Sequence, residues 1–455
     1  MRRSLEADRF DAALILEGAI LNEYVAQTET EAHFSACLLR WKEAMRAAGR
    51  RFGNGLGTYA QAARRLRPSI AFFVHQISSL AHVRLLLDVL EGHAALDEPL
   101  FDPVIVCFRG CANQAIKERI ARLRVEVVEI LRPEQDGVGV AELRRLREIL
   151  AQRGMHAIVW VSTVQCMAFS FAMRVAPVQA WWAMKYHGLE LAEIDGYLTA
   201  GSIAGGTRDI GGRVWRAGPI AAEDWLAPAL SAEAGQLRET YAKHRLLFGC
   251  FGREEKLNSP RFLEAVAQIL QAVPDAGFLW TGRHQHPRIQ AALEAAGVAG
   301  RCHFIGWVNT RLYAQVIDIF LDSFPFPCGY TLYESMAAGR PAVLYASVEA
   351  AETGARSMIE PLLLGEGGSA EDREKAQAIF RPRSGLDLYN CAQDPAAYVV
   401  LATRLANDTA FRGEAGRAGR EFVEQFMSDR GRVARIYGQH LLDIIAATTT
   451  QKEVG

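Results

Sequence analysis

The chain has 455 residues, half of them apolar, which allows two or three domains with sizeable cores and excludes global disorder. Its 51 Lys and Arg residues balance its 52 Asp and Glu residues, which argues against nucleic-acid binding because that requires a basic surface. The eight cysteines are scattered, without a second pair or a histidine cluster near Cys107 and Cys111, so we expect free thiols and no metal site.

The N-terminal residues carry charges where a signal peptide needs an apolar core, and no apolar run is long enough to span a membrane. We therefore expect a cytoplasmic protein without a transmembrane segment, while homo-oligomerisation and peripheral membrane contact stay open. Residues 1–66 show helical periodicity and no strand signals, which predicts an N-terminal helical segment.

A first alternation of strands and helices begins at Pro68. Apolar runs predict strands, and apolar residues at helical spacing predict the helices between them. The predicted strands are 70–74, 104–108, 125–131, 156–161 and 178–184. This alternation predicts a first domain over residues 67–220, built on a parallel sheet with helices on both faces. The chain contains neither a Gly-x-Gly-x-x-Gly after the first strand nor a Gly-Lys-Ser/Thr, so no dinucleotide site and no P-loop is predicted.

A second alternation follows a linker or bridging helix at 220–243. Its predicted strands begin at 246, 277, 302, 319 and 341, and they predict a second domain over residues 221–395. Long helices then return, and we expect residues 396–455 to pack back on the first domain. The predicted fold class is therefore α/β, with two Rossmann-like domains that face a cleft.

Polar residues follow the strands of the second domain. Lys256 follows its first strand, Thr281 and Arg283 follow the next, and Trp307 follows the third. Ligands of parallel sheets bind where strands end and helices begin, because helix N-termini attract phosphate. We therefore predict that Lys256 contacts a diphosphate, that Thr281 and Arg283 line the same crevice, and that Trp307 can stack on a base.

The stretch from Asp318 to Tyr345 predicts a strand, a loop, a helix and another strand. Prolines and Gly329 favour the loop, and residues 331–338 suit one short helix. Glu334 lies one turn into that helix, where a carboxylate suits a pair of sugar hydroxyls better than a phosphate. An ordinary strand–helix–strand unit with a solvated Glu334 is the alternative.

Two histidines at strand ends of the first domain, His82 and His187, are candidate general bases, because imidazole titrates near neutral pH. Glu193 and Asp195 are alternative bases.

Four stretches of the chain resemble a known group of enzymes. They run from Arg174 to Tyr197, Phe248 to Ala265, Phe278 to Arg283 and Phe324 to Gly339. Together they look like a GT-B glycosyltransferase, similar to the family of protein O-GlcNAc transferase and the bacterial adhesin N-glycosyltransferases. The resemblance covers about residues 68–345.

This resemblance implies roles for several of the candidate residues. Lys256 would contact the donor diphosphate, Tyr330 and Thr331 would stand at the phosphate-facing loop, and Glu334 would hold the ribose hydroxyls. His187 would stand near the family's histidine at the sugar; the match slips by one residue, so Lys185 or Tyr186 can also occupy that place.

The resemblance implies an inverting enzyme that moves a hexose from a UDP-sugar to a protein side chain, without a cofactor or a metal. Gly329 to Pro341 also looks like the retaining GT-B transferases, which act on glycans, lipids or small molecules. Their motif has a second Glu eight residues earlier, and this chain has Phe326 there. A third alternative is a non-catalytic module that binds a sugar nucleotide or a partner.

Overall fold

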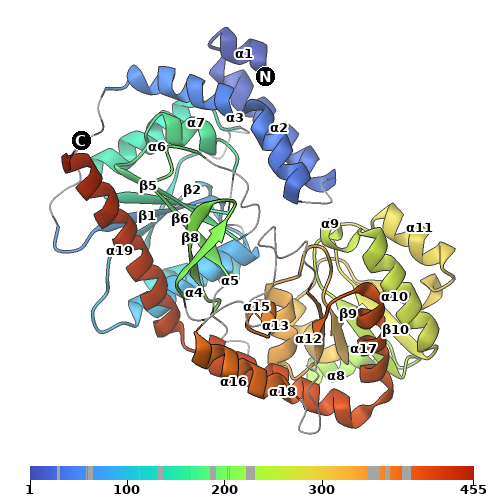
Figure 1. Ribbon diagram of the computed structural model, residues 1–455. Helices are drawn as coiled ribbons and strands as arrows, with labels where there is room; N and C mark the ends of the chain where they lie inside the picture. The colour runs from blue at the N-terminus through green and yellow to red at the C-terminus, as the bar shows by residue number, and fades with distance from the viewer. Residues whose placement is uncertain are drawn as a thin grey trace. The chain divides into compact units, whose positions relative to one another are not determined.

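A computed structural model gives the fold of the chain (Figure 1). It describes residues 1–27, 31–57, 59, 65–111, 113–131, 137–162, 164–184, 191–201, 203, 205–221, 231–346, 359–363, 369–381 and 391–454.

The chain divides into two compact units. Unit 1 comprises Met1–Ala200, Gly205–Ala221 and Arg430–Gly455, and unit 2 comprises Gly201–Ala204 and Ala222–Asp429. The N-terminal helical segment is thus part of unit 1. The expected C-terminal segment is divided, because its first two helices pack against strands and helices of unit 2 and only the last one packs in unit 1.

The described part of unit 1 contains an eight-stranded sheet in the order β3-β2-β1-β4-β5-β6-β8-β7. The strands are β1 Ser69–Gln76, β2 Asp102–Arg109, β3 Glu126–Glu129, β4 Ala157–Val161, β5 Val178–Ala183, β6 Gly196–Ala200, β7 Thr207–Ile210 and β8 Arg213–Gly218. Neighbouring strands are parallel, except that β7 is antiparallel to β8. The five predicted strands are confirmed. The last three were not predicted. Exposed residues interrupt the apolar runs of β7 and β8, and Gly196 and Thr199 interrupt that of the buried β6.

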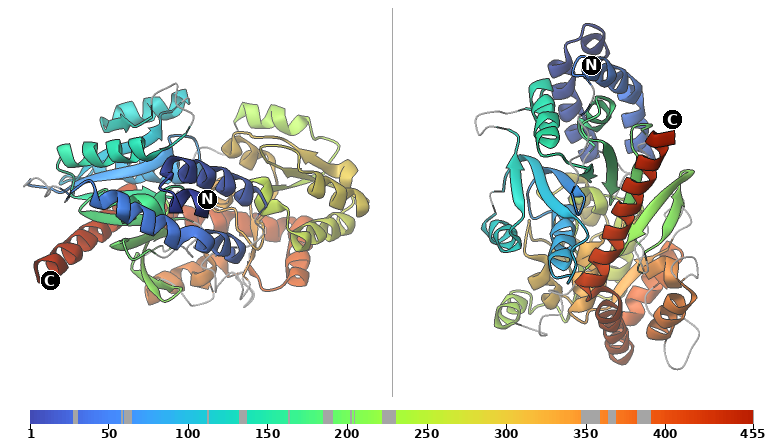
Figure 2. Two further views of the ribbon diagram at one scale, coloured as in Figure 1. Left: turned by 90° about the horizontal axis from the view of Figure 1, so that it is seen from above. Right: turned by 90° about the vertical axis from the view of Figure 1, so that its left-hand side faces the viewer.

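Helices cover both faces of this sheet (Figures 1 and 2). The described helices of unit 1 are α1 Arg2–Glu6, α2 Phe10–Gln27, α3 Glu31–Asn54, α4 Ala81–Ala94, α5 Gln114–Leu123, α6 Val140–Gln152, α7 Met167–Ala172 and α19 Arg430–Val454. Helix α3 packs on α7, whereas α19 packs on α4, β5 and β8. Tyr437 of α19 packs against Trp182 of β5 with ring centroids 4.5 Å apart, and Arg430 forms ion pairs with Asp88 and Glu91 of α4.

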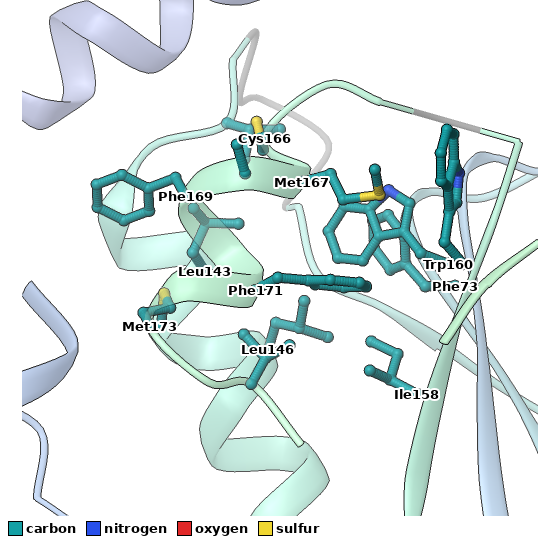
Figure 3. Close-up of a cluster of buried hydrophobic side chains, with 14 of the residues drawn as sticks. Phe73, Leu143, Leu146, Ile158, Trp160, Cys166, Met167, Phe169, Phe171 and Met173 are labelled. Carbon is teal, nitrogen blue, oxygen red and sulfur yellow. The ribbon is translucent and has the colours of Figure 1, made fainter. Parts of the chain in front are cut away.

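Large aromatic side chains fill the space between the sheet and α7 (Figure 3). The Trp160 ring lies 3.9 Å from the Phe73 ring and 5.5 Å from the Phe171 ring, measured between centroids. Each such side chain contributes roughly 1.5–3 kcal/mol when it is fully buried.

The N-terminal helices join this core through α7. A Cβ atom on Gly49 of α3 would lie 2.3 Å from the carbonyl oxygen of Phe169, so glycine allows the two helices to approach closely. The Phe169 ring then packs against both the Phe10 and the Phe52 ring, at centroid distances of 5.6 and 5.8 Å, and these two rings also contact each other at 6.0 Å.

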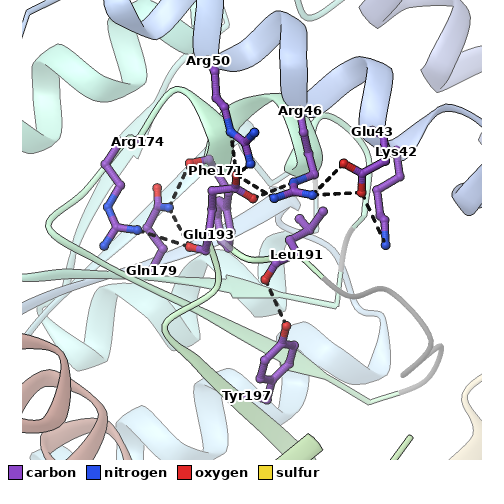
Figure 4. Close-up of polar contacts among 10 residues, drawn as sticks. All are labelled: Lys42, Glu43, Arg46, Arg50, Phe171, Arg174, Gln179, Leu191, Glu193 and Tyr197. Carbon is purple, nitrogen blue, oxygen red and sulfur yellow. Dashed lines mark hydrogen bonds and ion pairs between the residues drawn. The ribbon is translucent and has the colours of Figure 1, made fainter. Parts of the chain in front are cut away.

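Ion pairs also hold the C-terminal half of α3, next to Gly49 and Phe52 (Figure 4). The guanidinium groups of Arg46 and Arg50 donate hydrogen bonds to the Glu193 carboxylate, with closest distances of 2.8 and 2.6 Å. Burial opposes ionisation of Glu193, but the two arginines outweigh it and lower the pKa of its carboxyl. Gln179 of β5 donates to the Glu193 backbone oxygen at 3.0 Å, so this contact links α3 to the sheet.

The described part of unit 2 contains a six-stranded sheet, parallel throughout, in the order β11-β10-β9-β12-β13-β14. The strands are β9 Leu246–Cys250, β10 Ala276–Trp280, β11 Cys302–Phe304, β12 Ile319–Leu321, β13 Ala342–Tyr345 and β14 Cys391–Ala392. The helices are α8 Ala232–Glu239, α9 Glu254–Leu257, α10 Pro260–Ala272, α11 Pro287–Ala295, α12 Thr310–Val316, α13 Tyr330–Ala337, α15 Ile359–Leu363, α16 Ala370–Phe380, α17 Pro395–Asn407 and α18 Thr409–Met427. The predicted α/β class with two Rossmann-like sheets is therefore confirmed.

Candidate functional site

The centre of the unit 2 sheet is the place where the order of its strands changes direction. Strand β9 pairs with β10 on one side and with β12 on the other, whereas the chain continues from β9 to β10 and reaches β12 only later. In open parallel sheets, the carboxyl ends of two such strands flank a crevice in which ligands bind. The loops after β9 and β12 are therefore the first place to look for a site.

These two loops approach each other closely at Gly252. A Cβ atom at this position would lie 3.1 Å from Cδ1 of Leu257 and 3.2 Å from Sγ of Cys328. A larger side chain would push the loop of β12 away, so glycine holds the two strand ends together.

Two predicted site residues, Thr281 and Thr331, bind the loop after β9. The Thr281 hydroxyl donates to the carbonyl oxygen of Gly252 at 2.8 Å, and the Thr331 hydroxyl donates to that of Phe251 at 2.5 Å. A hydroxyl has a single hydrogen to donate. Both threonines thus position the loop, and each can meet a ligand only as a hydrogen-bond acceptor.

Lys256 of α9 brings a positive charge to the same strand ends. Its half-buried ammonium group donates to the carbonyl oxygen of Pro327, in the loop after β12. Burial lowers the pKa of Lys256, and the neighbouring Cys328 and Asp322 act in the opposite direction. The Asp322 carboxylate is buried and accepts a hydrogen bond from the backbone N–H of Cys328 at 2.6 Å.

Helix α13 starts directly after the loop whose Pro327 carbonyl oxygen accepts the hydrogen bond from Lys256. Its N-cap, Gly329, has a φ of +64°, a conformation that glycine adopts without strain, and a Cβ atom there would have open space around it. The N-terminus of a helix carries backbone N–H groups and a partial positive charge. Lys256 and the start of α13 therefore offer positive potential at one strand end, which suits a phosphate group.

Glu334 lies in the second turn of α13 and is only 2% exposed. Its Oε2 accepts a hydrogen bond of 2.6 Å from the hydroxyl of Thr310, the first residue of α12. The carboxylate is thus already oriented towards a hydroxyl donor. Trp307, in the loop between β11 and α12, exposes 55% of its surface.

Glu254 is a site residue that the sequence analysis missed. Its carboxylate is 2% exposed and accepts two hydrogen bonds of 2.9 Å from Arg283, one from the backbone N–H and one from Nε. Burial opposes ionisation, but backbone hydrogen bonds and the guanidinium together lower the pKa of Glu254. The predicted ligand residue Arg283 therefore already pairs with a buried carboxylate, while half of its side chain stays exposed.

Residues 245–376, which contain all these groups, match the family model described as glycosyl transferases group 1. This match and this fold are those of a glycosyltransferase. No curated protein matches the chain. A variant of the Thermobaculum terrenum O-GlcNAc transferase has a similar structure, with a TM-score of 0.62, 20% identity, and coverage of 89% of this chain and 74% of its own.

Two further solved structures share the GT-B fold with this glycosyltransferase. One is HepE of Anabaena in complex with UDP and glucose, with a TM-score of 0.57, 11% identity, and coverage of 83% of this chain and 100% of its own. The other is a glycosyltransferase of Rickettsia africae, with a TM-score of 0.54, 11% identity, and coverage of 85% of this chain and 99% of its own. At these identities the likeness establishes the fold.

The candidate bases of the glycosyltransferase belong to unit 1. His82 is the second residue of α4 and is half-buried, and His187 lies outside the described residues. Of the alternative bases, Glu193 pairs with two arginines and Asp195 pairs with Arg174 at 2.6 Å. These ion pairs give both carboxylates a structural role and argue against their use as bases.

In the part of the chain that the structure describes, no three or more His, Cys, Asp or Glu side chains are grouped to hold a metal ion. None of the described helices is both long and apolar enough to cross a membrane.

Proposed function

We propose that the protein transfers a hexose from a UDP-sugar to a protein side chain, with inversion at the anomeric carbon. The observation that carries the proposal is the convergence of Lys256, the start of α13 and Glu334 at the carboxyl edge of one sheet, where β9 and β12 lie side by side. An anionic diphosphate and a ribose each find a chemically matched group there.

In the proposed donor complex, the diphosphate lies between the Lys256 ammonium and the first N–H groups of α13. Glu334 accepts hydrogen bonds from the ribose hydroxyls, in the same way as it accepts one from the Thr310 hydroxyl. The exposed Trp307 indole supplies a flat surface for the uracil ring. The complex of HepE, which shares the fold, with UDP and glucose supports this choice of nucleotide.

Transfer requires that negative charge builds up on the departing UDP. Lys256 and the dipole of α13 stabilise this charge, and groups fixed in advance of the reaction are the most effective at doing so. The acceptor attacks the anomeric carbon from the opposite side, and a base takes its proton when the nucleophile is a hydroxyl. His82 and His187 remain the proposed bases.

Inversion is favoured over retention by Phe326. The retaining relatives carry a carboxylate eight residues before the ribose-binding one, and this chain has a buried phenyl ring at that position. The protein acceptor is supported by the resemblance of the chain to the family of protein O-GlcNAc transferase.

Calorimetric titration with UDP tests the donor site directly. We expect Lys256→Ala to weaken UDP binding by about 10- to 100-fold, since a hydrogen bond to a charged group contributes roughly 1.5–3 kcal/mol. The matched control is Lys243→Ala, which removes an exposed lysine before β9 and leaves affinity unchanged. Glu334→Gln should also lower the affinity for UDP, which contains the ribose, more than it lowers the affinity for uracil, which does not.

Turnover tests the reaction. We expect UDP release from a UDP-hexose with purified protein, a mass increase on co-expressed protein rather than on extracted glycolipid, and a product of inverted configuration by NMR. Unchanged UDP binding and turnover in both Lys256→Ala and Glu334→Gln would refute the site, and a protein that binds UDP without turnover would be a binding module.

A further inference from the structure

Two cysteines from different strands meet at the candidate site. Cys250 is the last residue of β9, and Cys328 lies in the loop between β12 and α13. Their sulfur atoms are 3.7 Å apart, and the side chains are 0% and 8% exposed. Both are free thiols. This proximity has no part in the proposed transfer reaction, so we asked what chemistry it permits.

The surroundings make the two sulfurs unequal. A hydrogen bond from Cys250 outweighs burial at Cys328, and together with the Lys256 charge and Ser323, whose hydroxyl lies 3.2 Å away, it lowers the pKa of Cys328 to about 5. Burial raises the pKa of Cys250. A thiolate next to a thiol is the pair that oxidation to a disulfide requires, because the thiolate is the nucleophile and the thiol resolves the intermediate.

We propose that Cys250 and Cys328 are a redox-sensitive dithiol that hydrogen peroxide converts into a disulfide. Peroxide is a small oxidant, and the residue Cys328 keeps 8% of its surface exposed. The Cys328 thiolate attacks one oxygen, a sulfur–oxygen bond forms, the oxygen–oxygen bond breaks, and hydroxide leaves. The Cys250 sulfur then attacks the Cys328 sulfur, the sulfur–oxygen bond breaks, and water leaves with the proton of Cys250. Hydroxide takes up the proton that Cys328 lost when it ionised, so two thiols and one peroxide give one disulfide and two waters.

The disulfide changes the site in two ways. The sulfurs must approach from 3.7 Å to about 2.05 Å, which draws the loop before α13 towards the end of β9. The negative charge beside Lys256 disappears at the same time, which by itself favours an anion. Resting on the proposed function, the displacement of the loop that leads into α13 predicts weaker UDP binding in the oxidised protein, by about tenfold if one charge-assisted hydrogen bond to the diphosphate is lost.

Peptide mapping tests the modification itself. Reduced full-length protein is treated with a small excess of peroxide, free thiols are blocked with N-ethylmaleimide, and digested peptides are analysed by mass spectrometry. We expect a linked pair of peptides containing Cys250 and Cys328, two hydrogens lighter than the sum of the free peptides, that separates on reduction. Cys302→Ser is the matched control and keeps the link, because the Cys302 sulfur instead donates to the Val298 carbonyl at 3.4 Å.

Variants and ligand binding complete the test. Cys250→Ala and Cys250→Ser should lose the link and should bind UDP equally well before and after peroxide, and thermal unfolding identifies whichever variant stays folded. Oxidation of other thiols without a link between Cys250 and Cys328 overturns the proposal. Should the reduced protein not bind UDP, the proposed function fails, whereas the peptide map still decides whether this dithiol exists.

Discussion

Glu17 in α2 and Glu254 in α9 are both 2% exposed, yet the pKa values of their carboxyl groups shift in opposite directions. Burial raises the pKa of Glu17 to about 7, although the Cys166 backbone N–H and the Trp41 side chain donate to it. Burial acts in the same sense on Glu254, but backbone hydrogen bonds and the Arg283 guanidinium outweigh it and lower the pKa. Equal burial thus yields a partly neutral group in unit 1 and a charged one in unit 2.

The difference reflects how each region is held together. The N-terminal helices attach to unit 1 through aromatic packing and through the ion pairs of α3 with Glu193, whereas the buried Glu17 among these helices accepts its hydrogen bonds from neutral donors. The strand ends of unit 2 instead collect full charges: Glu254 with Arg283, and Lys256 near Asp322 and Cys328. A region that has to bind an anion needs its own charges fixed, because unpaired charges inside a protein are unfavourable.

The largest expected effect comes from breaking the packed region. Phe169→Ala removes the buried ring that contacts both Phe10 and Phe52, and it should lower the free energy of unfolding by about 3–5 kcal/mol. Urea denaturation followed by tryptophan fluorescence measures this. Leu16→Ala is the control, because Leu16 is 39% exposed on α2 and should change stability by less than about 1 kcal/mol. Similar losses in both variants would contradict the packing role.

A pH series sharpens the comparison at Glu17. With a pKa raised from 4.5 to about 7, the folded state holds the proton more tightly, so the stabilisation is present below pH 4.5 and is lost as the pH rises to about 7. Each pKa unit corresponds to about 1.36 kcal/mol, so wild type should lose about 3 kcal/mol relative to Glu17→Gln between pH 4.5 and pH 8. Parallel curves for the two proteins would show that Glu17 does not titrate in this range.

The smallest expected effect comes from Arg283→Met, which leaves the buried Glu254 carboxylate without its cation. We expect a loss of about 1–2 kcal/mol at pH 7, reduced from the value for a buried pair because half of the arginine is exposed. The lowered pKa of Glu254 contributes stability above its ordinary value of 4.5 that is lost as the pH falls, so the variant should lose less than wild type on acidification. An Arg283→Met protein with the same acid sensitivity as wild type would argue that the backbone donors alone keep Glu254 charged.

Much of the fold was predictable because strands buried on both faces are apolar without interruption. The residues of β4, Ala157–Val161, are all buried and form such a run. Partly exposed strands such as β7, Thr207–Ile210, carry no comparable signal. Periodicity identified the C-terminal helices but did not reveal which unit each packs on, since that depends on partners distant in the sequence.

Candidate site residues could be predicted where their position directly after a strand is the only information needed. Lys256, Thr281 and Thr331 were predicted as site residues because they follow strands, and parallel strands bring such residues to one edge. Asp322 follows β12 directly and the same rule applies to it. Glu254 could not be found, because it sits in a run of charged residues that looks solvated, and its burial depends on Arg283, which lies 29 residues away.

The order of elements along the chain has a consequence for synthesis on the ribosome. Helix α19 is translated after the whole stretch 222–429, and it supplies Tyr437 beside Trp182 and Arg430 beside Asp88. The nascent unit 1 therefore cannot complete its fold until unit 2 has been synthesised, and until then the surface around Trp182 and Asp88 that α19 covers stays exposed. A premature stop codon near residue 430 would leave unit 2 intact and unit 1 permanently unfinished, so such truncated chains should depend on chaperones.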